Sequence, residues 1–107
     1  MNAYATSGWT ALGDSTRRAI FERLVEHPRA VGELADGLPI SRPAVSQHLK
    51  VLKDVGLVSE HAEGTRRIYR LNEAGVIALR DQFDTFWKRA LSGYEELVYE
   101  EPKEKRS

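Results

Sequence analysis

The side chains with the clearest chemical purpose lie on one short helical segment, Ser41 to Val58, "SRPAVSQHLKVLKDVGLV". Val45, Leu49 and Leu52 recur at helical spacing and predict a buried stripe. At about 100° per residue, the opposite face presents a hydroxyl, an amide and an ammonium group, from Ser46, Gln47 and Lys50. Glutamine can bond adenine through two hydrogen bonds, and serine can bond either base edge. This face is therefore suited to contact DNA bases.

Other residues in and around this segment can also contact DNA. Arg42 can bond guanine, Pro43 or Ala44 can touch a thymine methyl, and His48 and Lys50 suit phosphates. Arg66 and Arg67 lie near the tip of an expected hairpin, where they can grip phosphates or enter a minor groove. Thr16 and Arg17 lie near a helix N-terminus, which favours anions. The expected DNA-binding set is Thr16, Arg17, Arg42, Pro43, Ala44, Ser46, Gln47, His48, Lys50, Arg66 and Arg67.

Each of these assignments has an alternative. The face that carries Gln47 can be an ordinary solvated helix surface. Arg66 and Arg67 can pair across the hairpin with Glu60 or Glu63, which carry the opposite charge. Thr16 and Arg17 are equally consistent with a simple surface role.

Several other kinds of chemistry are disfavoured by the composition. The chain has no cysteine, which excludes thiolate nucleophiles and cysteine-based metal sites. His27, His48 and His61 lie on different expected elements, without a second ligand one helical turn away. There is no glycine-rich phosphate loop and no G-x-S-x-G motif. We expect no enzyme activity, no metal and no cofactor. With neither a signal pattern nor a long apolar run, we expect a cytoplasmic location without membrane contact.

The elements that position these residues form a winged helix-turn-helix, mainly α (α+β), in a single domain over residues 1–107. A helix capped by Asp14 or Ser15 precedes the helix-turn-helix, which spans about 32–55. Short β-type runs at 57–62 and 66–71 flank "EGT" and form a two-stranded wing over about 57–71. A C-terminal helix covers about 73–99. The net charge is zero, but cations outnumber anions between Ser41 and Arg70.

The C-terminal helix carries more apolar and aromatic surface than this small chain can cover by itself. Such a patch usually marks an interface, so we expect a homodimer. The expected dimerisation residues are Trp9, Leu12, Leu79, Phe83, Phe86, Trp87, Leu91 and Tyr94. A small hydrophobic inducer pocket near Trp9 and Trp87 is the alternative use of these aromatic side chains.

Three stretches, "ALGDSTRRAIFERL", "VGELADGLPISRPAVSQHLKVLKDVGLV" and "EGTRRIYRLN", resemble the ArsR/SmtB-type winged-helix repressors of prokaryotes. The resemblance covers about residues 9–98. It implies a homodimer, paired through its first and last helices, that occupies double-stranded operator DNA until an inducer releases it. The cysteine pair of many metal-sensing members is absent, and "FDTFWKRAL" is similar to members without a metal site.

We therefore expect a homodimeric transcriptional repressor that recognises a pseudo-palindromic operator and does not respond to a metal. The alternative is a winged-helix protein-interaction module without sequence-specific DNA binding. The residues do not identify an inducer, the operator or the regulated genes.

Overall fold

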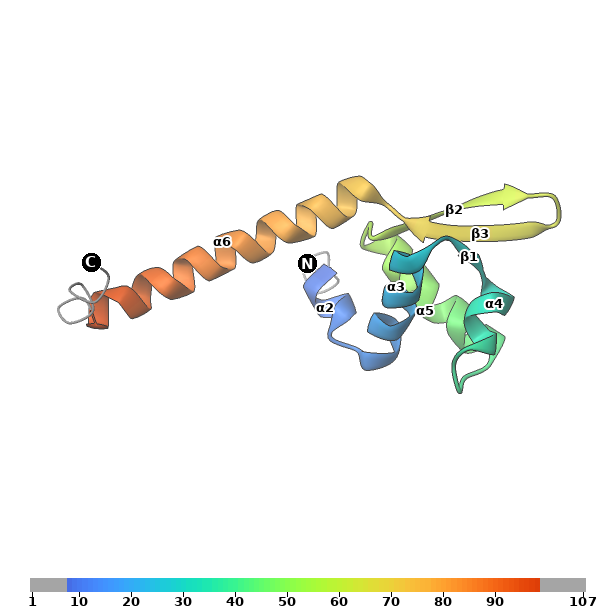
Figure 1. Ribbon diagram of the computed structural model, residues 1–107, viewed down its shortest axis with the longest axis horizontal. Coiled ribbons are helices and arrows are strands. Elements are labelled where there is room, and N and C mark those ends of the chain that lie inside the picture. Colours follow the sequence, from blue (N-terminus) through green and yellow to red (C-terminus); the bar gives the residue numbers. More distant parts are fainter. Residues whose placement is uncertain (1–7, 99–107) are drawn as a thin grey trace. The chain divides into compact units, whose positions relative to one another are not determined.

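The computed structural model describes residues 8–98, and side chains as far as residue 94 (Figure 1). The elements in chain order are α2 (Gly8–Leu12), α3 (Ser15–Glu26), β1 (Arg29–Ala30), α4 (Val31–Asp36), α5 (Arg42–Asp54), β2 (Val58–Glu63), β3 (Arg66–Leu71) and α6 (Glu73–Val98). The predicted fold class, mainly helical with a β wing and a long C-terminal helix, is confirmed. The chain divides into two compact units, one ending at Ile77 and one beginning at Ala78. The expectation of one domain over 1–107 therefore stays a prediction.

The helices of the first unit begin and end at local sequence signals. The Asp14 carboxylate accepts hydrogen bonds from the backbone N–H groups of Thr16 and Arg17, at 2.9 and 3.0 Å, so Asp14 caps α3. Ser41 caps α5, and its hydroxyl accepts from the N–H of Ala44 at 3.3 Å. These bonds satisfy amide groups that have no partner within the helix. After α5, Gly56 takes a φ of +84°, the left-handed conformation predicted from its position.

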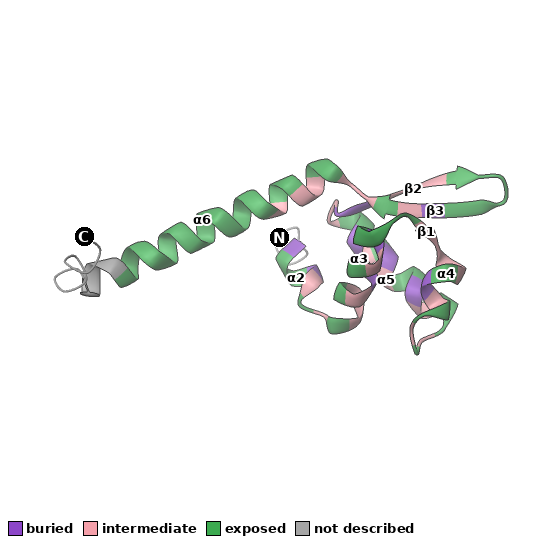
Figure 2. Cartoon of the chain, viewed as in Figure 1, coloured by how far each residue is buried: buried purple, intermediate pink, exposed green. Residues whose placement is uncertain are grey.

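The core of the first unit is small and entirely apolar among the described residues (Figure 2). Val45, Leu49 and Leu52 have no exposed surface, which confirms the buried stripe predicted for α5. The remaining core side chains are Ala11, Ile20, Leu24, Leu34, Leu57, Val58 and Ile68. Because the buried face of α5 packs in this core, its opposite face is presented to solvent.

The wing is an antiparallel hairpin of β2 and β3, joined at Gly64 with a φ of +67°. Its register places Glu60 opposite Tyr69 and Glu63 opposite Arg66. A third short strand, β1, pairs with β3 through Ala30 and Ile68. The two-stranded wing predicted from the sequence is therefore part of a three-stranded sheet with the order β1-β3-β2.

The first turn of α6 lies directly against the turn that follows α5. The side-chain amide of Asn72 donates to the carbonyl of Gly56 at 2.9 Å, and the backbone N–H of Asn72 donates to the carbonyl of Leu57, also at 2.9 Å. A Cβ added to Gly75 would lie 1.7 Å from the same Gly56 oxygen. Only glycine at position 75 allows this close approach.

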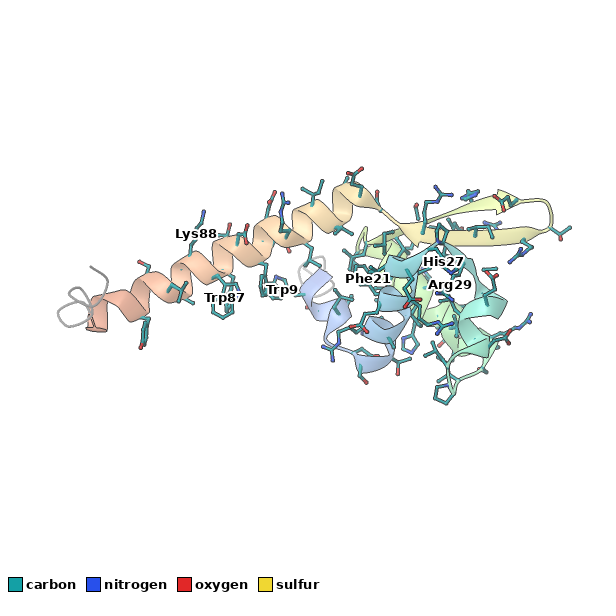
Figure 3. The ribbon with its side chains drawn as sticks, viewed as in Figure 1. Trp9, Phe21, His27, Arg29, Trp87 and Lys88 are labelled. Atoms are coloured by element: carbon teal, nitrogen blue, oxygen red, sulfur yellow. The ribbon has the colours of Figure 1, made fainter. Side chains whose placement is uncertain are left out.

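Beyond the first turns, α6 presents its side chains to solvent. Every described side chain from Arg80 to Tyr94 is exposed. The ring of Trp87 makes edge contacts with the rings of Phe83 and Phe86, with centroids 5.8 Å apart in each pair. Trp87 and Lys88 project from different sides of the helix (Figure 3). In the described stretch 8–98, no helix is long and apolar enough to cross a membrane.

Candidate nucleic-acid interface

The polar face of α5 lies where the helical spacing predicted it. Ser46, Gln47 and Lys50 are exposed. Lys50 makes an ion pair with Asp54, one turn along the helix, at 3.2 Å. Both side chains of that pair are more than half exposed, so the pair stabilises the helix by only a few tenths of a kcal/mol. The hydrogen-bonding groups of this face are therefore available to a ligand.

The other predicted contacts on α5 are less uniform. Arg42 and Pro43 are exposed at the start of the helix, whereas Ala44 and His48 are half-buried. The Nδ1 atom of His48 lies 3.4 Å from Nη1 of Arg17. His48 therefore lies between α5 and α3, and it is less accessible than the sequence suggested.

The start of α3 lies next to this face, because Arg17 joins α2, α3 and α5. Its Nε atom donates to the carbonyl of Ala11 at 2.9 Å, in addition to the contact with His48. Thr16 is half-buried. The backbone N–H of Arg17, more than any other group, lowers the pKa of Asp14. Arg17 thus has a structural role here, because it links α2 to His48 of α5.

Arg67 makes the ion pair that was considered as an alternative to DNA contact. Its guanidinium lies 3.0 Å from the carboxylate of Glu60, which also pairs with Lys53 of α5 at 2.9 Å. The hydrogen bond with Tyr69 is the main cause of the lowered pKa of Glu60, followed by Lys53. Burial, with the Glu60 carboxylate beside it, raises the pKa of Tyr69 to about 12. Glu60 therefore connects the wing to the end of α5.

Arg66 also has an acidic partner, but a different one from those predicted. It pairs at 3.2 Å with Glu33 of α4, not with Glu60 or Glu63 across the hairpin. Glu33 accepts a second hydrogen bond, at 2.7 Å, from the backbone N–H of Ala30. That bond is the main reason for the lowered pKa of Glu33. The sequence separation of 33 positions between Glu33 and Arg66 explains why this pair was missed.

A polar pocket of about 480 Å³ lies between α4, the start of α5 and the tip of the wing. The residues that line it include Arg42, Arg66 and Arg67 as well as Glu33 and Asp36. The sequence identified the three arginines but not the pocket that brings them together.

The expected dimerisation residues belong to both units of the chain. Trp9 and Leu12 lie on α2, in the unit that ends at Ile77, and Leu79 to Tyr94 lie on α6, in the other. Trp9, Phe83, Phe86, Trp87, Leu91 and Tyr94 are exposed, whereas Leu12 and Leu79 are half-buried. An inducer pocket near Trp9 and Trp87 would involve both units and stays a prediction.

In the described part of the chain, no group of three or more histidine, aspartate or glutamate side chains is arranged to hold a metal ion. Asp81 and Asp84 lie on α6 without a neighbouring histidine in the sequence.

Comparison with known proteins adds independent information. A helix-turn-helix domain family matches residues 12–61. The HTH-type transcriptional regulator Rv2034 of Mycobacterium tuberculosis is 61% identical over 90 residues, covering 84% of each chain. The HTH-type transcriptional repressor SmtB of the same species is 46% identical over 61 residues, which are 57% of this chain and 45% of that protein. The chain thus matches less than half of the length of that second relative.

A solved structure from Mycobacterium bovis is similar over almost the whole chain. It is the homodimeric winged helix-turn-helix DNA-binding domain of a possible ArsR-family transcriptional regulator. It is 29% identical, with a TM-score of 0.64, and the match covers 94% of this chain and 86% of that one.

Proposed function

Because this chain belongs to the ArsR/SmtB-type family of winged-helix transcriptional regulators, we propose that it is a homodimeric repressor that binds a pseudo-palindromic operator. Membership of this family establishes that the chain is a transcriptional regulator. The operator, the dimer and the independence from metals belong to the proposal, and each has its own support.

The observation that carries the proposal is the contrast between the two faces of α5. Val45, Leu49 and Leu52 are fully buried, so the helix has one orientation on the core. Ser46 and Gln47 are exposed in the N-terminal half of the helix, which is the half that enters the major groove in helix-turn-helix proteins. The buried stripe and the exposed row of hydrogen-bonding groups together support α5 as the recognition helix.

The surface of α6 supports a homodimer. Four large apolar side chains of α6 are 45–60% exposed: Phe86, Trp87, Leu91 and Tyr94. So much exposed apolar surface on one helix is unusual in a monomer. The Mycobacterium bovis domain, 86% of which is covered by the match, is homodimeric. In a two-fold dimer, two recognition helices read half-sites about 34–36 Å apart.

Repression without a metal is part of the same proposal. The chain has no cysteine, so it cannot sense metals through thiolates. Phe83, Phe86 and Trp87 occupy the stretch of α6 around Asp84, and their phenyl and indole rings are not metal ligands.

Footprinting on the DNA upstream of its own gene, followed by a salt titration, tests the proposal. We expect protection of an inverted repeat, with an affinity that falls steeply as ionic strength rises. A random duplex of equal length is the control and should bind more weakly. The alternative is a winged-helix protein-interaction module, and absence of binding to either duplex at low salt would favour it.

A further inference from the structure

Among the described residues that line the pocket between α4, α5 and the wing, one cation, Arg42, has no ion-pair partner. Arg66 is paired with Glu33, and Arg67 is paired with Glu60 outside the pocket. Within the part of the chain that the structure describes, no carboxylate lies within ion-pair distance of Arg42. Asp36 lines the same pocket but does not pair with it. Arg42 is thus ready to bind an anion.

Gly32 determines where the Arg42 guanidinium lies. A Cβ added to Gly32 would be 2.9 Å from Nη2 and 3.1 Å from Cζ of Arg42. The guanidinium therefore lies directly on the backbone of the first turn of α4, in space that any other residue at position 32 would fill. Glycine is otherwise a poor choice in a helix, because it destabilises the helix relative to alanine.

The opposite wall of the pocket can adapt to an anion. The Arg66–Glu33 pair is half exposed on both sides, and such pairs are weak in water. An incoming phosphate can therefore take Arg66 away from Glu33. Glu33 would keep its hydrogen bond from Ala30, so the start of α4 stays intact.

We propose that this pocket holds one backbone phosphate of bound DNA, that Arg42 is its main ligand, and that Gly32 is a positioning residue for Arg42. The proposal rests on the DNA-binding function proposed above. A guanidinium matches the geometry of phosphate oxygens and can donate two parallel hydrogen bonds to them. The pocket adjoins the start of the recognition helix, so this contact would set the register of α5 in the groove.

The test combines two single variants and the double variant in operator binding across a range of salt concentrations. Arg42→Gln should weaken binding about tenfold, because a charged hydrogen-bond donor is lost. It should also reduce the slope of log affinity against log salt by about 0.9, the value for one phosphate. Gly32→Ala should weaken binding severalfold, although it changes no charge. In the Arg42→Gln background, Gly32→Ala should have no further effect.

Gly37→Ala is the matched control for Gly32→Ala. It is the glycine after the same helix, and its added Cβ would meet the guanidinium of Arg23, at 2.5 Å, rather than that of Arg42. Gly37→Ala should leave operator affinity unchanged. Thermal melts should show Gly32→Ala folded and no less stable than the wild type, so that a loss of binding reports the position of Arg42.

Three results would overturn the proposal. The first is wild-type operator affinity in the Gly32→Ala variant. The second is an equal loss from Gly32→Ala whether or not Arg42 is present. The third is an unchanged slope of log affinity against log salt in the Arg42→Gln variant, which would show that Arg42 contacts no phosphate of the operator. Failure of the wild type to bind any DNA would instead refute the proposed function itself.

Discussion

Replacing Gly75 with alanine should destabilise the protein, although alanine is the better helix former. The added Cβ would lie 1.7 Å from the carbonyl oxygen of Gly56, whereas real Cβ atoms essentially never come within 3.0 Å of another heavy atom. The first turn of α6 must therefore move by at least the difference, 1.3 Å. The atom in the way belongs to the backbone, so it cannot swing aside as a side chain would.

The magnitude follows from three contributions. Forcing an extra carbon into a packed site costs about 1–3 kcal/mol. The hydrogen bond from Asn72 to the Gly56 carbonyl, 2.9 Å long, would be stretched by the same movement, and its loss costs about 1 kcal/mol. The higher helix propensity of alanine stabilises the variant by about 1 kcal/mol and partly offsets these losses. We expect the free energy of unfolding to fall by about 1–3 kcal/mol.

Urea unfolding followed by circular dichroism, at one protein concentration, measures this change. Gly93→Ala is the control on the same helix, because no described atom lies within 4 Å of its added Cβ. That variant should gain up to about 1 kcal/mol from helix propensity alone. Sedimentation must show the same oligomeric state for both variants. Equal or greater stability of Gly75→Ala than of the wild type would refute the reasoning.

Three further predictions concern the operator, the dimer and the pH dependence of stability. Gln47→Ala should weaken operator binding by about 1–3 kcal/mol and relax the preference at one base pair; an equal loss on random DNA would contradict base reading. Phe83→Glu should give monomers in sedimentation, because a dimer would bury an unpaired carboxylate; an intact dimer would exclude Phe83 from the interface. The pKa of Tyr69 is raised from 10.0 to about 12, so its contribution to stability is complete below pH 10 and disappears as the pH rises through 12. Over that range Tyr69→Phe should lose less unfolding free energy than the wild type; equal losses in both proteins would remove Tyr69 as the cause.

The elements with local signals were predictable from the sequence. Ser41 has a side chain that bonds an amide three residues later, and Gly56 and Gly64 allow backbone conformations that other residues avoid. Each signal acts within a few residues of its own position, so a single sequence contains it. The hydrophobic stripe of α5 was equally clear, because Val45, Leu49 and Leu52 follow the helical period.

The features that were missed depend on residues far apart in the chain. β1 has only two residues, too few for an alternating pattern, and it exists because Ala30 lies opposite Ile68 of β3. The Glu33–Arg66 pair and the pocket between α4 and the wing arise only after the hairpin folds back on α4. One signal was available: glycine inside an expected helix indicates close approach of another group, and Gly32 and Gly75 both have such a neighbour.

The ion pairs of the wing affect how the salt dependence of DNA binding should be interpreted. Arg66 and Arg67 already hold carboxylates, at 3.2 and 3.0 Å, and these act as internal counterions. When Arg66 moves to a phosphate, DNA loses a condensed cation, but the freed Glu33 carboxylate attracts one from solution, whereas Glu60 keeps its pair with Lys53 when Arg67 moves. The net release from the Arg66 contact is therefore smaller than the about 0.9 ion expected for Arg42, which has no carboxylate partner among the described residues. The salt dependence of operator affinity should therefore underestimate the number of phosphates that the protein contacts, and the shortfall would count the exchanged pairs.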